Sequence, residues 1–458
     1  MRTGAARLLP LLIGLALAPA AWGQPGPKAG ASGAAVGAAH DAVLRDARVA
    51  RALEAIQADD ARTFDEQKRI AGIAAPPFGE GERAAYILRR MREVGLADAA
   101  LDAEGNVVAL RKGTSGKGTS GNGASGNGAG RLKLVVSAHL DTVFPAGTDL
   151  TVRERDGITS APGIGDDARG LAALLSLVQA LDASAIDTVA DVMVVATVGE
   201  EELGNLRGVR ALFRDHPDID GFISIDGLSV GRIVNQGTGS RRYEITFRGP
   251  GGHSFQEFGR PSATHAMGRA IAKIAEVRTP ADPKTTFTVG TVAGGTSVNA
   301  IAAEARITLD MRSNAESELA KVEERVLGLV REAAAEENRR WEADSLRVEI
   351  KLIGDRPVGA VPEDSPIAQA SRRAVERLAR GPSVTFAGSS TDSNLAMSLG
   401  IPAVTIGGGG DGGNWHSLTE WYRPTEAHLG PQSALVILLT LAGIDGVSQP
   451  VLAPRARR

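Results

Sequence analysis

The sequence predicts an α/β fold with two parts: a larger domain built on a largely parallel central sheet, and an α+β domain of ferredoxin-like type inserted into it. Two observations lead to this prediction. From residue 131 onward, apolar strand-like runs alternate with helical patterns, an order typical of parallel sheets. Between residues 239 and 354 the order changes to strand, helix, strand, strand, helix, strand, which is the order of a ferredoxin-like sandwich.

The elements of the larger domain follow from periodicity and from end signals. Helical periodicity runs with breaks from residue 41 to about 94, and Ser365 before Pro366 marks the start of a later helix. The predicted strands are 105–110, 132–137, 192–198, 221–225, 384–386 and 403–406, and the later predicted helices are 171–181, 209–213, 366–380 and 431–444.

The inserted domain takes residues 239–354 and divides the larger domain into 41–238 and 355–446. Its expected strands are 243–247, 285–292, 305–312 and 347–352, and its expected helices are 265–277 and 317–339.

Four segments are expected to lie outside the packed domains. Residues 1–23 read as a secretory signal peptide, because two arginines precede an apolar run that ends in a small-x-small pattern. Residues 24–40 are expected to form a flexible spacer, and 447–458 a disordered tail. The Gly/Ser-rich segment 113–130 has too few apolar residues to pack and is expected to form a solvated loop.

Composition narrows the possible partners and ligands. The 458 residues carry a net charge of −3, and loss of 1–23 with its two arginines gives −5. This mild acidity argues against nucleic acid or an anionic membrane as partner, and the apolar run at the N-terminus is too short for a stable membrane anchor. The chain has no cysteine, so a metal would be held by His, Asp or Glu.

Polar residues follow each parallel strand at the point where ligands bind in open α/β sheets. His139 and Asp141 end the 132–137 strand region two residues apart, so they point the same way. The other residues at these strand ends are Glu200, Glu201, Glu202, Asp226 and His416, with Asp166 and Asp167 at the start of a helix.

Two histidines and several carboxylates at one sheet edge form a donor set suited to two divalent ions. A carboxylate that bridges the ions is needed to hold them roughly 3.5–4 Å apart, and an aspartate at a helix start is well placed to do so. Taken singly, acids at such positions are commonly solvated or cap helices. The arrangement strand by strand favours a metal site.

The motifs HLDTV, PGIGDDARG, EEELG, IDG and GGNWHSLTE, in this order, resemble the co-catalytic zinc exopeptidase family that includes peptidase T, carnosinase, aminoacylase, bacterial glutamate carboxypeptidase and succinyl-diaminopimelate desuccinylase. The resemblance covers roughly residues 45–446 and implies a zinc-exopeptidase-like catalytic domain with an inserted dimerisation or lid domain. It implies two Zn²⁺ per subunit, with Co²⁺ or Mn²⁺ as alternatives. The implied ligands are His139 and Asp226 for one ion, Glu202 and His416 for the other, and Asp166 as the bridge.

The same resemblance implies the catalytic roles. Asp141 is expected to support His139, and Glu201 to act as general base on a water whose pKa the ions lower. The chain has Glu200 where the family usually has Asp. In the inserted domain, His253 is expected to stabilise the oxyanion in the active site of a partner subunit, while Asn299 and Arg312 hold the substrate.

These expectations lead to an exported metallopeptidase that forms a homodimer and hydrolyses amide bonds of short peptides. In the family, an aspartate at the position of Asp226 goes mainly with aminopeptidases and dipeptidases, which favours that activity. The alternative is an N-acyl amino acid deacylase or carboxypeptidase that uses Arg312 for the substrate carboxylate. A catalytically inactive binding protein is a remote alternative, since no expected ligand or base is missing.

Overall fold

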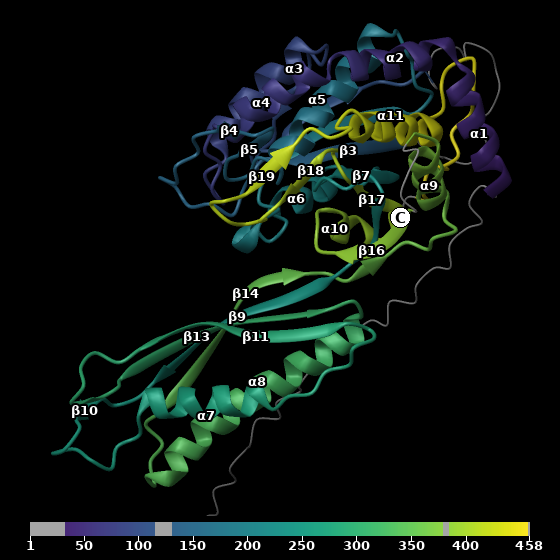
Figure 1. Cartoon of the computed structure of the whole chain (residues 1–458). Coiled ribbons are helices and arrows are strands. Elements are labelled where there is room, and N and C mark those ends of the chain that lie inside the picture. The colour runs from purple at the N-terminus through teal and green to yellow at the C-terminus, as the bar shows by residue number, and fades with distance from the viewer. Residues whose placement is uncertain (1–32, 115–130, 379–383, 457–458) are drawn as a thin grey trace, which may run out of the picture.

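The computed structural model describes residues 33–114, 131–378 and 384–456. It shows a larger α/β domain and an elongated inserted domain that extends away from it (Figure 1). The predicted fold class is confirmed.

The larger domain is organised around a nine-stranded sheet in the order β1-β2-β6-β3-β7-β17-β8-β15, with β16 also paired to β8. Its four central strands β6, β3, β7 and β17 are mutually parallel, as predicted. The strands are β1 (Ala100–Leu101), β2 (Val107–Arg111), β3 (Lys133–His139), β6 (Asp191–Thr197), β7 (Gly221–Ile225), β8 (Arg232–Gly237), β15 (Gly359–Ala360), β16 (Thr385–Ser389) and β17 (Ala403–Ile406).

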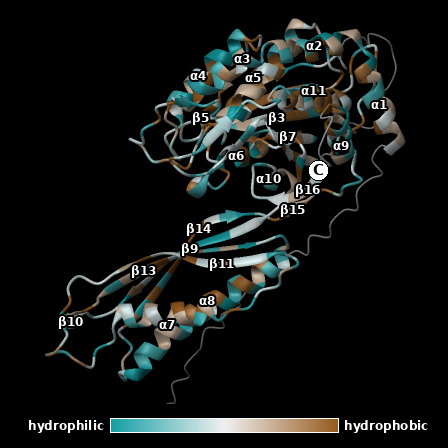
Figure 2. Ribbon diagram, in the orientation of Figure 1, coloured by the Kyte–Doolittle hydropathy of each residue, from teal (hydrophilic) through white to brown (hydrophobic). Residues whose placement is uncertain are grey.

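Helices cover both faces of this sheet, with α5 and α11 on one face and α6 and α10 on the other (Figure 1). Every residue of α11 is buried, which explains its nearly continuous apolar sequence. The central strands are brown in Figure 2, in keeping with strands buried on both faces. The helices are α1 (Gly33–Arg45), α2 (Ala47–Ala58), α3 (Asp60–Ala71), α4 (Gly81–Glu93), α5 (Ala168–Ala183), α6 (Arg207–Asp215), α9 (Pro366–Leu378), α10 (Ser393–Ser398) and α11 (Leu429–Ala442).

The inserted domain has a four-stranded antiparallel sheet in the order β11-β13-β9-β14, which is the ferredoxin-like order. Helices α7 and α8 pack on one face of the sheet, and Ile245, Ile307 and Val326 lie in the core between the two layers. The elements are β9 (Gly239–Arg248), α7 (Ala263–Ala275), β11 (Thr285–Gly294), β13 (Glu304–Ser313), α8 (Glu316–Arg340) and β14 (Arg347–Arg356).

Two small sheets were not predicted. One has the order β18-β19-β5-β4 and brings the chain near residue 420 against the segment before Asp166. The other pairs β10 with β12 at the far end of the inserted domain (Figure 1). The strands are β4 (Arg153–Arg155), β5 (Ile158–Ser160), β10 (Gly252–His253), β12 (Ala300–Ile301), β18 (Asp411–Gly413) and β19 (Trp421–Arg423).

Two predictions about the ends of the chain were wrong. The prediction of a flexible spacer over 24–40 is wrong from residue 33 onward, because α1 starts at Gly33 and buries Val36 and His40. Residues 24–32 lie outside the described part. Up to residue 456 the tail 447–458 is packed and ordered. Val451 and Leu452 are buried, and the Arg455 N–H donates to Asp220 Oδ1 at 2.7 Å. Neither segment shows a clear hydrophobic periodicity in the sequence, so the packing of α1 and of the tail was not predicted.

The signal-peptide prediction for 1–23 and most of the 113–130 loop fall on residues that the structure does not describe. Among the helices that it does describe, none is long and apolar enough to cross a membrane.

Candidate metal centre

His139 is the last residue of β3, and its ring lies between two oxygen atoms. Its Nδ1 is 3.0 Å from the carbonyl oxygen of Asp141, and its Nε2 is 2.9 Å from Asp166 Oδ1. Because Nδ1 can donate its proton to the carbonyl, Nε2 is the nitrogen available to a metal. Burial alone would lower the pKa of His139, but the nearby carboxylates of Asp167, Asp141 and Asp166 outweigh burial and raise it well above its usual value.

Asp166 contacts both histidines. Its Oδ1 faces His139, while its Oδ2 lies 3.1 Å from His416 Nε2. Burial would raise the pKa of Asp166, but the contacts with the two histidines hold it below its usual value. Each oxygen of this carboxylate faces a histidine that could bind a metal ion, so Asp166 lies where a ligand bridging two ions would lie.

Asp167 has a different environment, although it follows Asp166 directly. Its Oδ1 accepts the Gly170 N–H at 3.0 Å and so caps α5, and its Oδ2 accepts the His139 N–H at 3.0 Å. Both oxygens are therefore engaged with the backbone, which leaves Asp166 as the aspartate available to bridge.

Asp226 follows β7 and joins His139 on the other side of the site. Ligand atoms of His139, Asp167 and Asp226 lie within 4.8 Å of one another. Burial and the nearby Asp166 carboxylate raise the pKa of Asp226 to about 7. The structure thus brings together the predicted pair of His139 and Asp226.

Of the three consecutive glutamates, Glu202 is placed differently from the prediction. Glu201 is buried, its Oε1 lies 3.2 Å from His416 Nε2, and it forms a second possible ligand cluster with His139 and Asp166. Glu202 begins a short 3-10 turn, η1 (Glu202–Gly204), and its side chain is exposed. The structure therefore does not bring the predicted ligand Glu202 into the cluster, because the chain turns outward there, and Glu201 occupies the place beside His416.

Asp141 supports the site in a way that differs in detail from the prediction. The nearest oxygen of its carboxylate is 3.6 Å from His139 Nδ1, which is closer to the Asp141 carbonyl. The two carboxylate oxygens accept the N–H groups of Glu200 at 3.0 Å and Glu201 at 2.7 Å. Asp141 therefore joins the end of β3 to the glutamate segment that follows β6.

Two buried acids near the site were missed by the sequence analysis. Glu420 accepts the N–H groups of Gly163, Gly165 and Asp166 at 2.8–3.1 Å. Asp392 accepts the Thr197 hydroxyl at 2.6 Å, although no role was predicted for the segment that contains it. Glu420 belongs to the GGNWHSLTE motif, so a signal was present, but nothing in the sequence identified its partners.

The electrostatics of the centre favour bound cations. Burial, with the Asp166 charge in the case of Glu420, raises the pKa of Glu420 to about 7 and that of Asp392 to about 6. Such shifts arise where carboxylates are crowded in a medium of low polarity without enough positive charge. Imidazole nitrogen and carboxylate oxygen suit zinc and similar divalent ions, so the donor set fits the implied metals.

The three site residues predicted in the inserted domain separate into two locations. His253 on β10 and Asn299 lie at its far end, where the Ser254 N–H donates to the Asn299 carbonyl at 3.0 Å. Arg312, near the end of β13, pairs opposite Ser240 at the start of β9 and so lies at the end next to the larger domain. Strand β10, which carries His253, lies at the end of the inserted domain away from the larger domain (Figure 1), so His253 and Asn299 do not reach the metal centre of their own chain.

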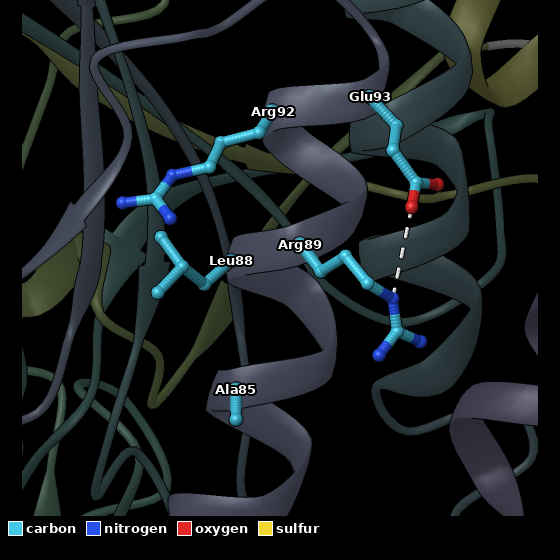
Figure 3. A pocket seen from close by; sticks show the side chains of 5 residues that line it. All are labelled: Ala85, Leu88, Arg89, Arg92 and Glu93. Carbon is cyan, nitrogen blue, oxygen red and sulfur yellow. Dashed lines mark ion pairs between the residues drawn. The ribbon is translucent and has the colours of Figure 1, made fainter.

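A surface hollow elsewhere offers no comparable chemistry. It is lined by one side of α4, with Ala85, Leu88, Arg89, Arg92 and Glu93, and Arg89 forms a 3.7 Å ion pair with Glu93 (Figure 3). An i,i+4 ion pair on an exposed helix is an ordinary surface feature, and we assign it no function.

An open sheet with four parallel central strands, an inserted ferredoxin-like domain and a centre with two histidines around a shared aspartate define a metal-dependent hydrolase of the co-catalytic type. The family model described as Peptidase family M20/M25/M40 matches residues 135–440, so the chain belongs to this family of metallopeptidases.

The chain is also similar to individual proteins of known sequence or structure. It is 24% identical over 362 residues to the uncharacterised protein YqjE of Bacillus subtilis, covering 76% of this chain and 90% of that one. Aminopeptidase PepT of Bacillus cereus superposes with a TM-score of 0.64 at 21% identity, covering 83% of this chain and 98% of that one. The YxeP protein of Bacillus subtilis, a dinuclear metal-binding peptidase, has a TM-score of 0.57 at 17% identity, with coverages of 84% and 99%.

Proposed function

We propose that the protein is an exported two-zinc aminopeptidase or dipeptidase that hydrolyses amide bonds of short peptides. The observation that carries this proposal is the position of Asp166, with one carboxylate oxygen on His139 and the other on His416. His139, Asp166, Asp226 and His416 would hold the ions, and Glu202, whose side chain is exposed, would join them by turning inward when the ions bind.

Two bound divalent ions would polarise the scissile carbonyl and lower the pKa of a nucleophilic water. Glu201 is buried beside this centre, and the Asp141 carboxylate holds its backbone N–H at 2.7 Å. A carboxylate fixed in this way can take a proton from the attacking water and return it to the leaving amine. Glu201 is therefore our proposed general base.

The substrate class rests on charges near the centre. Arg312 Nε donates to Asp310 Oδ2 at 2.7 Å, and Arg242 Nε donates to Asp310 Oδ1 at 3.1 Å. One carboxylate thus serves two guanidinium groups, which leaves positive charge for a substrate carboxylate such as the C-terminus of a dipeptide. The same feature supports the alternative, an N-acyl amino acid deacylase or carboxypeptidase. Asp226 favours the aminopeptidase or dipeptidase, because the family resemblance associates an aspartate at this position with those activities.

A homodimer would complete the site. Strand β9 has ten residues, so its two ends are roughly 30 Å apart. The metal centre lies near its first residues, since Arg242 donates to the Glu202 carbonyl, whereas His253 lies beyond its last residue. His253 and Asn299 would therefore act on the substrate of a partner subunit, and the exposed apolar side chains of Phe255 and Val298 beside them favour such a contact.

The N-terminal leader pattern supports the proposal of export. The donor set of imidazole and carboxylate without thiolate supports zinc, and Co²⁺ or Mn²⁺ would also fit it. Neither nucleic acid nor a membrane anchor is part of the proposal.

The test is metal analysis of the purified protein, combined with hydrolysis assays on dialanine, N-acetyl-alanine and dialanine amide. We expect two metal ions per chain and cleavage of the peptide with a free N-terminus. Cleavage of N-acetyl-alanine alone would favour the deacylase. Two bound ions without hydrolysis of any of these amides would favour the inactive binding protein.

A further inference from the structure

The segment that carries the proposed base is attached to the two strands that connect the inserted domain to the larger one. These strands are β9, where the insertion begins, and β14, where it ends. Arg242 on β9 donates to the Glu202 carbonyl, and the Asp355 N–H on β14 donates to Asn205 Oδ1 at 2.8 Å. The inserted domain therefore contacts the glutamate segment from both of its connections.

The most buried of these attachments is an ion pair between Arg356 and Glu200. Arg356 is the last residue of β14 and is 3% exposed, and Glu200 is 4% exposed. Arg356 Nη1 lies 3.1 Å from Glu200 Oε1 and 3.1 Å from Ser390 Oγ, and its Nη2 donates to the Glu200 carbonyl. One guanidinium thus binds both the side chain and the backbone of Glu200.

Glu200 is held on its other side as well. Its N–H and that of Glu201 donate to the two carboxylate oxygens of Asp141. The peptide unit that leads into Glu201 is therefore fixed between Asp141, at the end of β3, and Arg356, at the end of the inserted domain. A displacement of this unit would displace the Glu201 side chain with it.

We propose that Arg356 is a positioning residue: through Glu200 it sets the place of the Glu201 carboxylate and couples it to the orientation of the inserted domain. The proposal rests on the proposed function of Glu201 as base. Geometry errors of about 1 Å at a catalytic group can lower a rate about a hundredfold.

The test uses the double variant Glu200→Met/Arg356→Met. Replacing a buried ion pair by apolar side chains of similar size is often neutral for stability, whereas removing one partner leaves an uncompensated buried charge and destabilises the protein. We expect the double variant to fold and to keep two metal ions per chain. Its kcat on dialanine should fall by about tenfold or more, with KM changed by less than about twofold. Arg356→Lys keeps the charge but cannot form all the hydrogen bonds of the guanidinium at once. Its kcat should therefore lie between that of the parent protein and that of the double variant.

The matched control is Arg241→Met. Arg241 lies on β9 beside Arg242, but it pairs with Glu316 at 2.7 Å and Asp355 at 2.8 Å, both within the inserted domain. It should leave kcat unchanged. A double variant with the kcat of the parent protein, or one that loses metal, would overturn the proposal. If the double variant does not fold, Arg356→Lys is judged by the same criteria.

Hydrogen–deuterium exchange provides a readout that does not depend on activity. The amides of residues 200–205 should exchange faster in the double variant, while those of α8 stay protected. If the parent protein hydrolyses none of the tested amides, the proposed function fails, but faster exchange at 200–205 still supports the coupling. Unchanged exchange in this segment contradicts it.

Discussion

The carboxylate of Glu420 holds the backbone of Asp166. Glu420 Oε1 accepts the Asp166 N–H at 3.1 Å and the Gly165 N–H at 2.8 Å, and Oε2 accepts the Gly163 N–H at 3.0 Å. Because Glu420 follows His416 by four positions, one short segment both supplies a histidine of the centre and fixes the loop that carries Asp166.

Glu420→Gln should therefore weaken metal binding. Glutamine keeps one acceptor oxygen and places an NH₂ group against backbone N–H groups that need an acceptor. We expect the dissociation constant of at least one metal ion to rise by about tenfold or more, measured by calorimetric titration of the metal-free protein. Glu426→Gln removes the same charge from an exposed position nearby and should bind metal like the parent protein.

Glu201 and Glu202 are predicted to have different tasks. Glu201→Gln should keep both metals while kcat falls by roughly a hundredfold or more, because the amide cannot accept the proton. Glu202→Gln should lower the metal content of the protein, because Glu202 is expected to turn inward and act as a ligand when ions bind. The structure places Glu201 beside His416, so metal analysis that finds the loss in Glu201→Gln instead would make Glu201 the ligand.

His253 is predicted to act across a dimer. His253→Ala should slow the reaction by an amount equivalent to about 3–4 kcal/mol in the barrier and leave the metals bound, since an oxyanion donor is lost. His253→Ala mixed with Glu201→Gln should regain activity, because a mixed dimer has one site with an intact Glu201 and an intact partner histidine. At random exchange of equal amounts, half the dimers are mixed and each has one working site of two, so about a quarter of full activity returns.

The control for this mixture is each variant alone at the same total concentration. Subunit exchange is confirmed separately with differently tagged chains. Exchange without recovery of activity would show that His253 does not act in the partner's site.

Glu337 should make the inserted domain sensitive to acid. Its fully buried carboxylate accepts the Ser262 N–H, Arg269 Nε and Trp341 Nε1, each at 3.1 Å. Burial alone would raise the pKa of Glu337, but these bonds outweigh it and lower the pKa below its usual value of 4.5. A lowered folded-state pKa stabilises the protein above the unfolded-state pKa, and this stabilisation is lost as pH falls through the folded-state value.

Glu337→Gln should consequently lower the free energy of unfolding by roughly 2 kcal/mol at pH 7. The difference from the parent protein should shrink below about pH 4.5, because the carboxylate becomes protonated there in the unfolded chain and, at lower pH, in the folded protein as well. Denaturant unfolding at several pH values measures this. Glu332→Gln, which removes a half-exposed partner of Lys273, should change stability by less than about 0.5 kcal/mol. A difference for Glu337→Gln that stays constant down to pH 3 would contradict the assignment.

Residues 115–130 should be removable down to a short turn. The residues on either side are already close, since Arg131 Nη2 donates to the Gly113 carbonyl at 2.6 Å and to Asp191 Oδ1 at 2.5 Å. Loop closure costs only about 0.6 kcal/mol per doubling of length, so shortening changes stability little. The shortened protein should keep its melting temperature within a few degrees and its metal content, and loss of either would reveal a packed role for the segment.

Much of the fold could be predicted from the sequence because its signals are local. Strands β7 and β17 have the predicted limits, and the order of the four main strands and two helices of the inserted domain was correct, since apolar periodicity and turn residues act over a few positions. Strand β8 and the small sheet containing β19 were missed, because they are short or polar and are stabilised by pairing with distant segments.

The candidate centre, too, has features that the sequence predicts and features that depend on the tertiary structure. The sequence by itself determined which residues stand at the carboxyl ends of the parallel strands, and thereby that His139, Asp166, Asp226 and His416 belong to one site. Only the tertiary structure decided that Glu201 faces His416, that Glu420 holds the Asp166 loop and that Arg356 reaches Glu200 from the inserted domain. These contacts join residues far apart in the chain, and which carboxylate meets which donor depends on backbone turns and on burial between domains, which no local pattern encodes.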